Sequence, residues 1–270
     1  MEKGEVYPNA PVVLVTMELR HPPTEPLGDS ETRELKRLLS DRLPIERPAQ
    51  QVTFEIAGPA APPITNVERF TRYLNRESTA AAAIREHSIV VETSAYRGWD
   101  DFLDLVSLAL EARMQISRVA GVERIGLRYI DEIRVPDTTN SSIDWGHWIE
   151  SPYLGPRPAS SAGLELTEWQ GAAVYRGDRM GQSLVVRYGP RDGFAVDPTS
   201  DLRRVRMADA GEFFLVDIDS FWVPEDAIPE YDAEATISLC HDLHRPVRTF
   251  FEGMITERLR NEVLRHDGQT

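Results

Sequence analysis

The sequence predicts an α+β protein of mostly antiparallel sheets covered by long amphipathic helices. Three observations carry this prediction: short apolar or alternating segments are bounded by proline and glycine, two pairs of them are joined as hairpins, and longer segments carry apolar residues at helical spacing. With 270 residues, of which 41% are hydrophobic and 27% charged, the chain has the composition of an ordinary globular protein with a sizeable core.

The first half is predicted to open with a buried strand at residues 12–19, where an apolar run is mixed with alternation. Asp29 or Ser30 is expected to cap a helix over residues 31–42, because a short side-chain oxygen accepts a bond from a free amide of the first turn. Apolar residues alternate again over residues 52–56, which predicts a second strand.

The middle of the chain is predicted to contain a hairpin, a helix and a long strand. The hairpin pairs residues 68–75 with residues 82–96, although the alanines at 80–83 also suit a helix. Residues 98–117 carry acids in the first turn and apolar side chains on one face, as an amphipathic helix does. Apolar side chains alternate through residues 122–135, which predicts the strand.

The last part of the chain has a similar succession of elements. A hairpin is predicted from residues 163–175 and 182–188, joined by a glycine-containing turn. A strand over residues 212–222 precedes a long helix over residues 233–265. Pro246 should kink or split this helix, because proline lacks an amide donor.

Two halves are therefore expected, residues 1–136 and 163–270, with residues 137–162 as a polar, proline-containing connection. In each half an aromatic-ended strand leads into an amphipathic helix. This pattern is compatible with an old duplication of one α+β unit. The match is one of pattern and not of residues, so two unrelated halves are an equal alternative.

The charge balance constrains the partners and the location. The chain has 30 basic and 44 acidic residues and a formal net charge of −14. A net-acidic surface repels phosphate backbones, so nucleic acid is not an expected partner unless arginines gather on one face, whereas a basic protein surface suits it. No segment has the roughly 18 consecutive apolar residues of a membrane span or the apolar region of a signal peptide, so a cytoplasmic location without membrane contact is expected.

Cys240 and the neighbouring histidines offer little for catalysis or metal binding. Cys240 is the only cysteine and falls on the apolar stripe of the last predicted helix, where a free cysteine acts as a small hydrophobe. His241 and His244 lie three residues apart on that helix, but no clustered ligand set accompanies them. Neither a metal nor a cofactor is expected.

Asp217 and Asp219 stand two residues apart in a predicted strand and therefore point to the same face. Two carboxylates placed in this way can hold a divalent cation or share a proton. Phe213 and Leu215 share the same face, so the favoured alternative is ion pairing, in which a partly buried Asp217 requires a partner such as arginine.

The predicted long strand carries a second group of candidates. Arg124, Arg128 and Glu132 share one face of it, whereas Tyr129 and Asp131 share the other. An arginine fork on the first face can clamp a carboxylate or a phosphate. The favoured alternative is a cross-strand ladder to acidic neighbours.

Several segments together resemble a known family. They read YRGWDDF at residues 96–102, GLRYIDEI at 126–133 and FEGMITERL at 251–259, with the Asp217-Ile-Asp219 strand and Leu243-His244 in matching order. These segments resemble a sporadically distributed bacterial protein family of unknown function, whose members carry a strand close to GLRYIN-x-I. The resemblance covers most of the chain and implies no activity, cofactor or catalytic residue. Asp131 stands where the family commonly has asparagine, so no role that needs an amide donor carries over.

Three classes of function are compatible with these patterns. The favoured class is a non-catalytic protein-binding module, such as an antitoxin, immunity or phage-defence component, because no catalytic constellation is present and the family's patchy distribution resembles that of such genes. The second is an enzyme or small-ligand-binding protein with an Arg/Asp site between the halves, and the third is nucleic-acid binding through a local arginine face. No catalytic residue and no oligomeric state is predicted. The candidate ligand- or partner-binding residues are Arg124, Arg128, Tyr129, Asp131, Asp217, Asp219 and His244.

Overall fold

The computed structural model describes residues 5–55, 64–136, 143–156, 169–206 and 208–266. Its strands are β1 (Val12–Arg20), β2 (Ile45–Glu55), β3 (Ile64–Leu74), β4 (Ala80–Ile84), β5 (Ser88–Thr93), β6 (Arg124–Ile133), β7 (Gly171–Arg176), β8 (Gln182–Arg191) and β9 (Phe213–Trp222). They form one nine-stranded sheet in the order β2-β3-β4-β5-β1-β6-β9-β8-β7, and every pair of neighbours is antiparallel.

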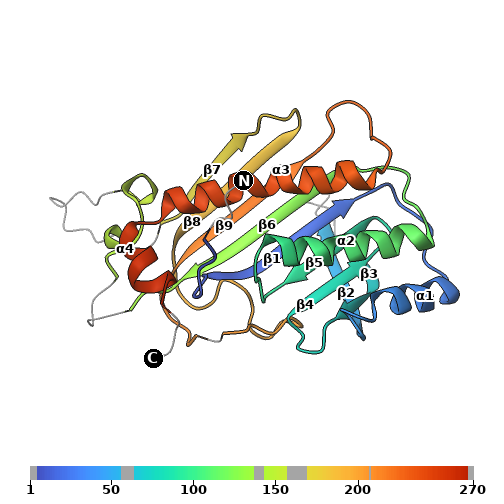
Figure 1. The fold of residues 1–270 in the computed structure, drawn as a ribbon, viewed down its shortest axis with the longest axis horizontal. Coiled ribbons are helices and arrows are strands. Elements are labelled where there is room, and N and C mark those ends of the chain that lie inside the picture. The colour runs from blue at the N-terminus through green and yellow to red at the C-terminus, as the bar shows by residue number, and fades with distance from the viewer. Residues whose placement is uncertain (1–4, 56–63, 137–142, 157–168, 207, 267–270) are drawn as a thin grey trace.

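The helices lie on one face of this sheet (Figure 1). They are α1 (Asp29–Leu39), α2 (Trp99–Ile116), α3 (Ala233–Met254) and the short α4 (Glu257–Leu259), which a π-helical turn (Arg260–Leu264) follows. Two short 3-10 turns, η1 (Trp145–His147) and η2 (Ser151–Tyr153), precede β7. The layering confirms the α+β class with antiparallel pairing. The helices are shorter than predicted, since α3 has 22 residues.

The core lies between the helices and the sheet. Val15, Met17 and Leu19 alternate along β1 and are buried, as expected of a strand with one covered face. Phe102 and Val106 of α2 belong to the same apolar cluster. We call the opposite side of the sheet the open face. The chain between β8 and β9 covers part of it, where Leu202 forms a second, smaller apolar cluster with Leu74 and Ala81.

The run of alanines forms strand β4 and not a helix. Residues 82–96, predicted as one strand, instead form two strands, because the polar residues 85–87 make a tight turn between β4 and β5. The Arg85 N–H closes this turn by donating to the Ser88 carbonyl at 2.8 Å. Ala82 is buried beneath the helices, so the pairing with β3 and β5 decides the conformation over the helical propensity of alanine.

The ends of the first elements also differ from the prediction. Helix α1 begins at Asp29, so neither Asp29 nor Ser30 is its cap. Gly28 occupies the cap position, and its N–H donates to the Glu31 carboxylate at 2.8 Å. Strand β2 begins at residue 45 rather than 52 and includes Pro48, which an edge strand tolerates because one row of its amides needs no partner.

The C-terminal helix is interrupted later than predicted. Helix α3 continues through Pro246 and ends at Met254, where Ile255 is extended and forms an isolated bridge to Ile149. Pro246 has no amide for the carbonyl of Asp242 one turn earlier. The side-chain amide of Gln182 on β8 donates to this carbonyl instead, at 3.4 Å. A neighbouring strand thus supplies a donor that the helix lacks.

Strand β6 connects the two predicted halves, because it pairs with β1 on one side and with β9 on the other. On each side of the β1–β6 pair, the next strand of the sheet leads into a helix: β5 leads into α2, and β9 leads into α3. The boundaries at residues 136 and 163 and the duplication stay predictions, and residues 163–168 of the predicted hairpin lie outside the described part of the chain. Within the described part, no helix is long and apolar enough to cross a lipid bilayer.

Candidate functional site

The two faces of β6 divide the predicted site residues as expected. Arg124 and Arg128 lie on the open face, and the Arg128 side chain is half-exposed. Tyr129 and Asp131 lie on the face covered by the helices and are buried. The candidates therefore form separate groups on opposite sides of the sheet, and not one site.

Asp217 on β9 accepts hydrogen bonds from Arg128 in a bidentate arrangement. The Nε and Nη2 atoms of Arg128 lie 2.7 and 2.9 Å from the two carboxylate oxygens, and Arg187 of β8 approaches at 3.6 Å. The hydrogen bond to Asp217 raises the pKa of the Arg128 guanidinium. The predicted pairing of a partly buried Asp217 with arginine is confirmed.

Asp219 belongs to a second ion-pair group on the open face. Arg124 lies between two acids, 2.9 Å from Glu18 on β1 and 3.2 Å from Asp219. Burial raises the pKa of Asp219 despite the opposing charges of Arg124 and Arg128. Each carboxylate of the predicted pair is thus engaged by arginine, so the arrangement ties strands β1, β6, β9 and β8 together rather than presenting free ligands.

On the covered face, Tyr129 and His244 form part of an aromatic cluster beneath α3. The Tyr129 hydroxyl lies 3.1 Å from His244 Nδ1 and 3.4 Å from the Tyr96 hydroxyl. Trp99 stacks on His244 with ring centroids 4.2 Å apart and planes within 4°. Burial lowers the pKa of His244 to about 4, so this imidazole is neutral near pH 7.

His241 contacts the same tryptophan from another side. The indole Nε1 of Trp99 donates to His241 Nδ1 at 2.9 Å, whereas the Nδ1 of His244 lies against the Tyr129 hydroxyl, so the Nδ1 atoms of the two imidazoles have different hydrogen-bond partners. Among the described residues, no group of three or more His, Cys, Asp or Glu side chains is placed to hold a metal ion. Cys240 is buried in the core cluster, and burial raises the pKa of its thiol to about 12.

Asp131 is a buried carboxyl group that no described residue engages by a hydrogen bond or an ion pair, although it is only 6% exposed. Burial raises its pKa to about 7, and the negative charge of Asp217 adds to the shift. Its neighbour across the strand pair is Val12 of β1. A neutral side chain at this position would avoid the free-energy cost of burying an unpaired charge.

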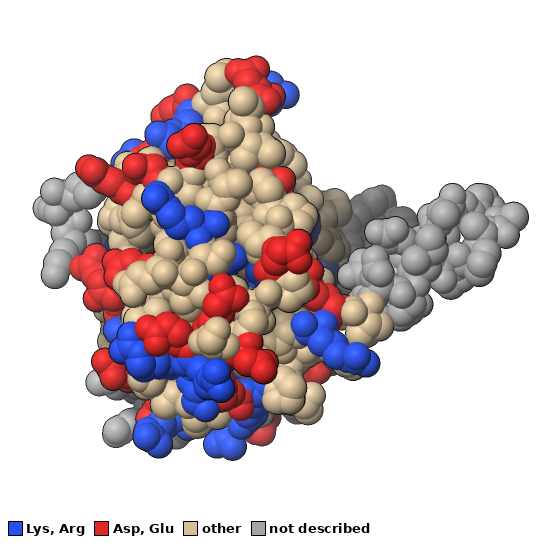
Figure 2. All heavy atoms as spheres, turned by 90° about the vertical axis from the view of Figure 1, so that its right-hand side faces the viewer, with Lys and Arg blue, Asp and Glu red and all other residues tan. Residues whose placement is uncertain are grey.

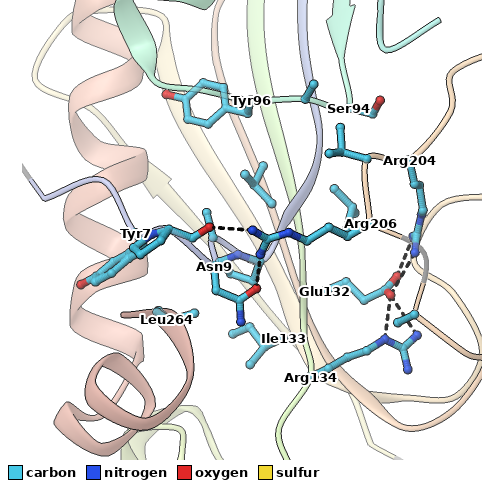
Figure 3. Close-up of a pocket in the computed structure, with 18 of the residues that line it drawn as sticks. Tyr7, Asn9, Ser94, Tyr96, Glu132, Ile133, Arg134, Arg204, Arg206 and Leu264 are labelled. Atoms are coloured by element: carbon cyan, nitrogen blue, oxygen red, sulfur yellow. Dashed lines mark hydrogen bonds and ion pairs between the residues drawn. The ribbon is translucent and has the colours of Figure 1, made fainter. Parts of the chain in front are cut away.

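A pocket of about 430 Å³ lies where the N-terminal segment crosses the ends of β5 and β6 (Figure 3). Its described lining includes one acidic residue, Glu132, and four arginines; we call it the arginine pocket. The arginines are Arg97, Arg134, Arg204 and Arg206. A pocket with four positive charges against one negative charge stands out in a chain whose net charge is −14.

Glu132 holds two of the arginines in place. Arg204 donates to both oxygens of its carboxylate at 3.0 and 2.6 Å, and Arg134 donates at 2.9 Å from another direction (Figure 3). Burial alone would raise the pKa of Glu132, but these bonds and one from the Ala195 N–H hold it below the ordinary value. Arg204 is nearly buried, and its Nε finds no partner among the described residues.

Arg206 and Arg97 have no acidic partner among the described residues. Arg206 extends across the pocket in Figure 3 and donates to the Asn9 side-chain oxygen and, at 3.0 Å, to the Pro8 carbonyl. Arg97 is exposed at the pocket rim. Two guanidinium groups that face neutral oxygens or water are available to a negatively charged ligand.

The remaining lining is largely apolar and aromatic. Tyr7 and Tyr96 also belong to the lining, and their hydroxyls contact Glu252 and Tyr129. Val12, Val13, Val205, Val263 and Leu264 contribute aliphatic side chains. Sequence reasoning missed this pocket, because its arginines come from segments that only the fold brings together. The only signal in the sequence was a charged residue at every second position, in Glu132-Ile-Arg134 at the end of β6 and in Arg204-Val-Arg206 between β8 and β9.

In comparisons with known proteins, no protein-family model matches the chain and no curated protein is significantly similar to it. The resemblance to the bacterial family therefore rests on the segments quoted from the sequence. Inference about function rests on the geometry of the described residues.

Proposed function

We propose that this protein binds a small acidic molecule in the arginine pocket. The observation that carries the proposal is the charge of the lining, four arginines with a single glutamate, in an otherwise strongly acidic chain. The volume of about 430 Å³ lies within the range of ordinary ligand sites. This function belongs to the second of the three classes compatible with the sequence, an enzyme or small-ligand-binding protein, but it uses different residues from the Arg/Asp site given there.

The lining also constrains the ligand. A carboxylate or phosphate oxygen matches the planar fork of Arg206, which now faces the Asn9 amide oxygen and the Pro8 carbonyl. A charged acceptor forms a stronger bond than these neutral ones, so the ligand would replace them. Glu132 keeps Arg134 and Arg204 fixed, and the apolar walls suit a ligand with a hydrocarbon or aromatic body.

Thermal unfolding with added ligands tests this proposal. A series of aliphatic and aromatic monocarboxylates and phosphate monoesters should include compounds that raise the Tm, because a ligand that binds only the folded state stabilises it. The variants Arg206→Gln and Arg97→Gln should reduce the rise. Arg33→Gln, at an exposed arginine of α1, is the matched control and should leave it unchanged. A rise that persists in Arg206→Gln contradicts the proposal, as does the absence of any rise.

A protein partner with a basic surface is the second candidate, favoured by one feature of α2. The exposed side of this helix carries Asp100, Asp101, Asp104 and Glu111, and among the described residues only Asp101 has an ion-pair partner, Arg42 at 3.4 Å. Figure 2 shows acidic and basic side chains interspersed over the end of the molecule that it displays, so the acidic excess is not gathered into one broad area there. A basic partner would therefore bind the local acidic strip on the exposed side of α2, and not a broad acidic surface.

Salt dependence tests the second candidate. A basic partner recovered from the native host should bind more weakly at high salt, because exposed charges are screened within about 10 Å at 0.1 M ionic strength. Replacing Asp100, Asp104 and Glu111 by their amides should weaken binding further at low salt. Binding that is unaffected by the salt concentration and by these substitutions argues against the acidic strip of α2 as the interface.

A further inference from the structure

The two edges of the sheet differ in how they are protected. Edge strand β2 carries Pro48 next to Arg47 and Glu46, and such residues prevent another strand from pairing with it. Edge strand β7 reads GAAVYR and has no proline and no charge before Arg176. Within the described part of the chain, β7 pairs only with β8, so one row of its backbone groups is unpaired.

Apolar side chains are exposed on the same hairpin. Val174 is 71% exposed, Tyr175 45% and Met180 67%. Beside them, a groove of about 880 Å³ runs between the hairpin and α3. Its aromatic wall consists of Tyr175, Phe250 and Tyr153. The ring centroid of Phe250 lies 5.6 Å from that of Tyr175 and 5.5 Å from that of Tyr153. Exposed apolar area beside an unprotected edge is typical of a binding surface.

The charges around the groove favour an acidic occupant. Arg176 and Arg179 line it and have no ion-pair partner among the described residues. Arg245 also lines it but is paired with Asp242 at 3.1 Å. Asp178 is the other acid of the lining, so the free charge at the end of β7 is positive. A second copy of the chain, with its net charge of −14, is repelled as a whole.

We infer that β7 accepts an extended segment of another protein as a tenth strand, and that this segment is apolar with acidic residues at the end near Arg176 and Arg179. Its backbone would pair with the free edge of β7, as in other cases of strand addition. Its side chains on the covered face would lie beside Ala173 and Tyr175, at the border of the groove. This surface is separate from the arginine pocket, and neither proposal depends on the other.

Binding of labelled peptides, followed by fluorescence anisotropy, tests the inference. The probe is a capped hexapeptide with two aspartates followed by alternating valine and threonine. It should bind, and a version with two lysines in place of the aspartates should bind about tenfold more weakly. Arg176→Glu should cause a similar loss, whereas Arg33→Glu, at an exposed arginine of α1, should not.

Backbone pairing is tested with the protein unchanged. Two versions of the acidic peptide carry N-methyl groups on alternate residues, one set on the odd and one on the even positions. Only alternate amides of an added strand point at its neighbour, so one version should lose binding and the other should retain it. Equal binding by both versions overturns the inference, as does no preference for the acidic peptide. A dimer in solution that the peptide dissociates would also overturn it, because the occupant would then be a second copy.

Discussion

Arg128 and Asp217 are joined across strands β6 and β9 by two hydrogen bonds of 2.7 and 2.9 Å, one to each carboxylate oxygen. Arg187 of β8 reaches the same carboxylate, so a single acid links three neighbouring strands. The side chain of Asp217 is 7% exposed, whereas that of Arg128 is 49% exposed. The acid is therefore the buried member of the group, and the arginines extend towards solvent.

Asp217→Ala should lower the free energy of unfolding by about 2 kcal/mol. The loss should be smaller than for a fully buried pair, because the freed guanidinium groups of Arg128 and Arg187 are half-exposed and can turn into water. Urea denaturation measures it. Asp242→Ala, which removes a partly exposed pair with Arg245, is the control and should cost less than about 0.5 kcal/mol. Equal losses in the two variants would contradict this distinction.

Glu132→Gln should destabilise the protein more strongly, by about 3–5 kcal/mol, because the side chains of Glu132 and Arg204 are both nearly buried. The amide leaves Arg204 and Arg134 without a negative partner at the arginine pocket. Denaturation at pH 7 checks the size of the effect. Because the pKa of Glu132 is lowered in the folded state, its stabilisation is present above the unfolded pKa and is lost as the pH falls through the folded pKa. The variant should therefore approach the parent protein in acid.

Cys240 should not react with thiol reagents in the folded protein. The side chain is 1% exposed and burial raises its pKa to about 12, so both access and the thiolate fraction are low near pH 7. Labelling with a chromogenic disulfide should be slow in buffer and complete in denaturant. Rapid labelling without denaturant would show that α3 opens at this point.

The sequence predicts well which side chains share a face of a strand, because successive side chains alternate between the two faces. The opposite placement of Arg128 and Tyr129, and the shared face of Asp217 and Asp219, follow from strand geometry alone and are confirmed. Element ends are less predictable. Helix α3 passes Pro246, and Gln182 from a distant strand supplies a donor to the freed carbonyl, a contact that no local pattern contains.

The arginine pocket could not be predicted for a similar reason. Arg97, Arg134, Arg204 and Arg206 come from three separate segments of the chain, and only the crossing of the N-terminal segment over the sheet brings them together. These four arginines do not stand out in the sequence, because arginine is common throughout this chain. In contrast, the pairing of Asp217 with arginine was predictable, since both partners sit on strands whose faces the pattern defines.

Asp131→Asn should stabilise the protein, and the gain should depend on pH. Burial raises the pKa of the Asp131 carboxyl from 3.8 to about 7, with a further contribution from Asp217, and no described residue forms a hydrogen bond or ion pair with it. The folded state thus binds a proton that the unfolded state releases between about pH 4 and pH 7. When the folded state binds the extra proton, stability falls as the pH rises. Asparagine has no such proton to lose.

The difference in unfolding free energy between Asp131→Asn and the parent protein should therefore be small near pH 4, grow as the pH rises and level off above about pH 7. A shift of about three pKa units corresponds to a gain on the order of 4 kcal/mol at the plateau. Urea denaturation of both proteins at several pH values gives this difference directly, and other titrating groups cancel in it. Asp104→Asn, at an exposed carboxylate of α2, serves as the control and should show no comparable rise. A constant difference for Asp131→Asn across this range would mean that the buried carboxyl keeps an ordinary pKa, and hence that solvent or an unseen donor reaches it.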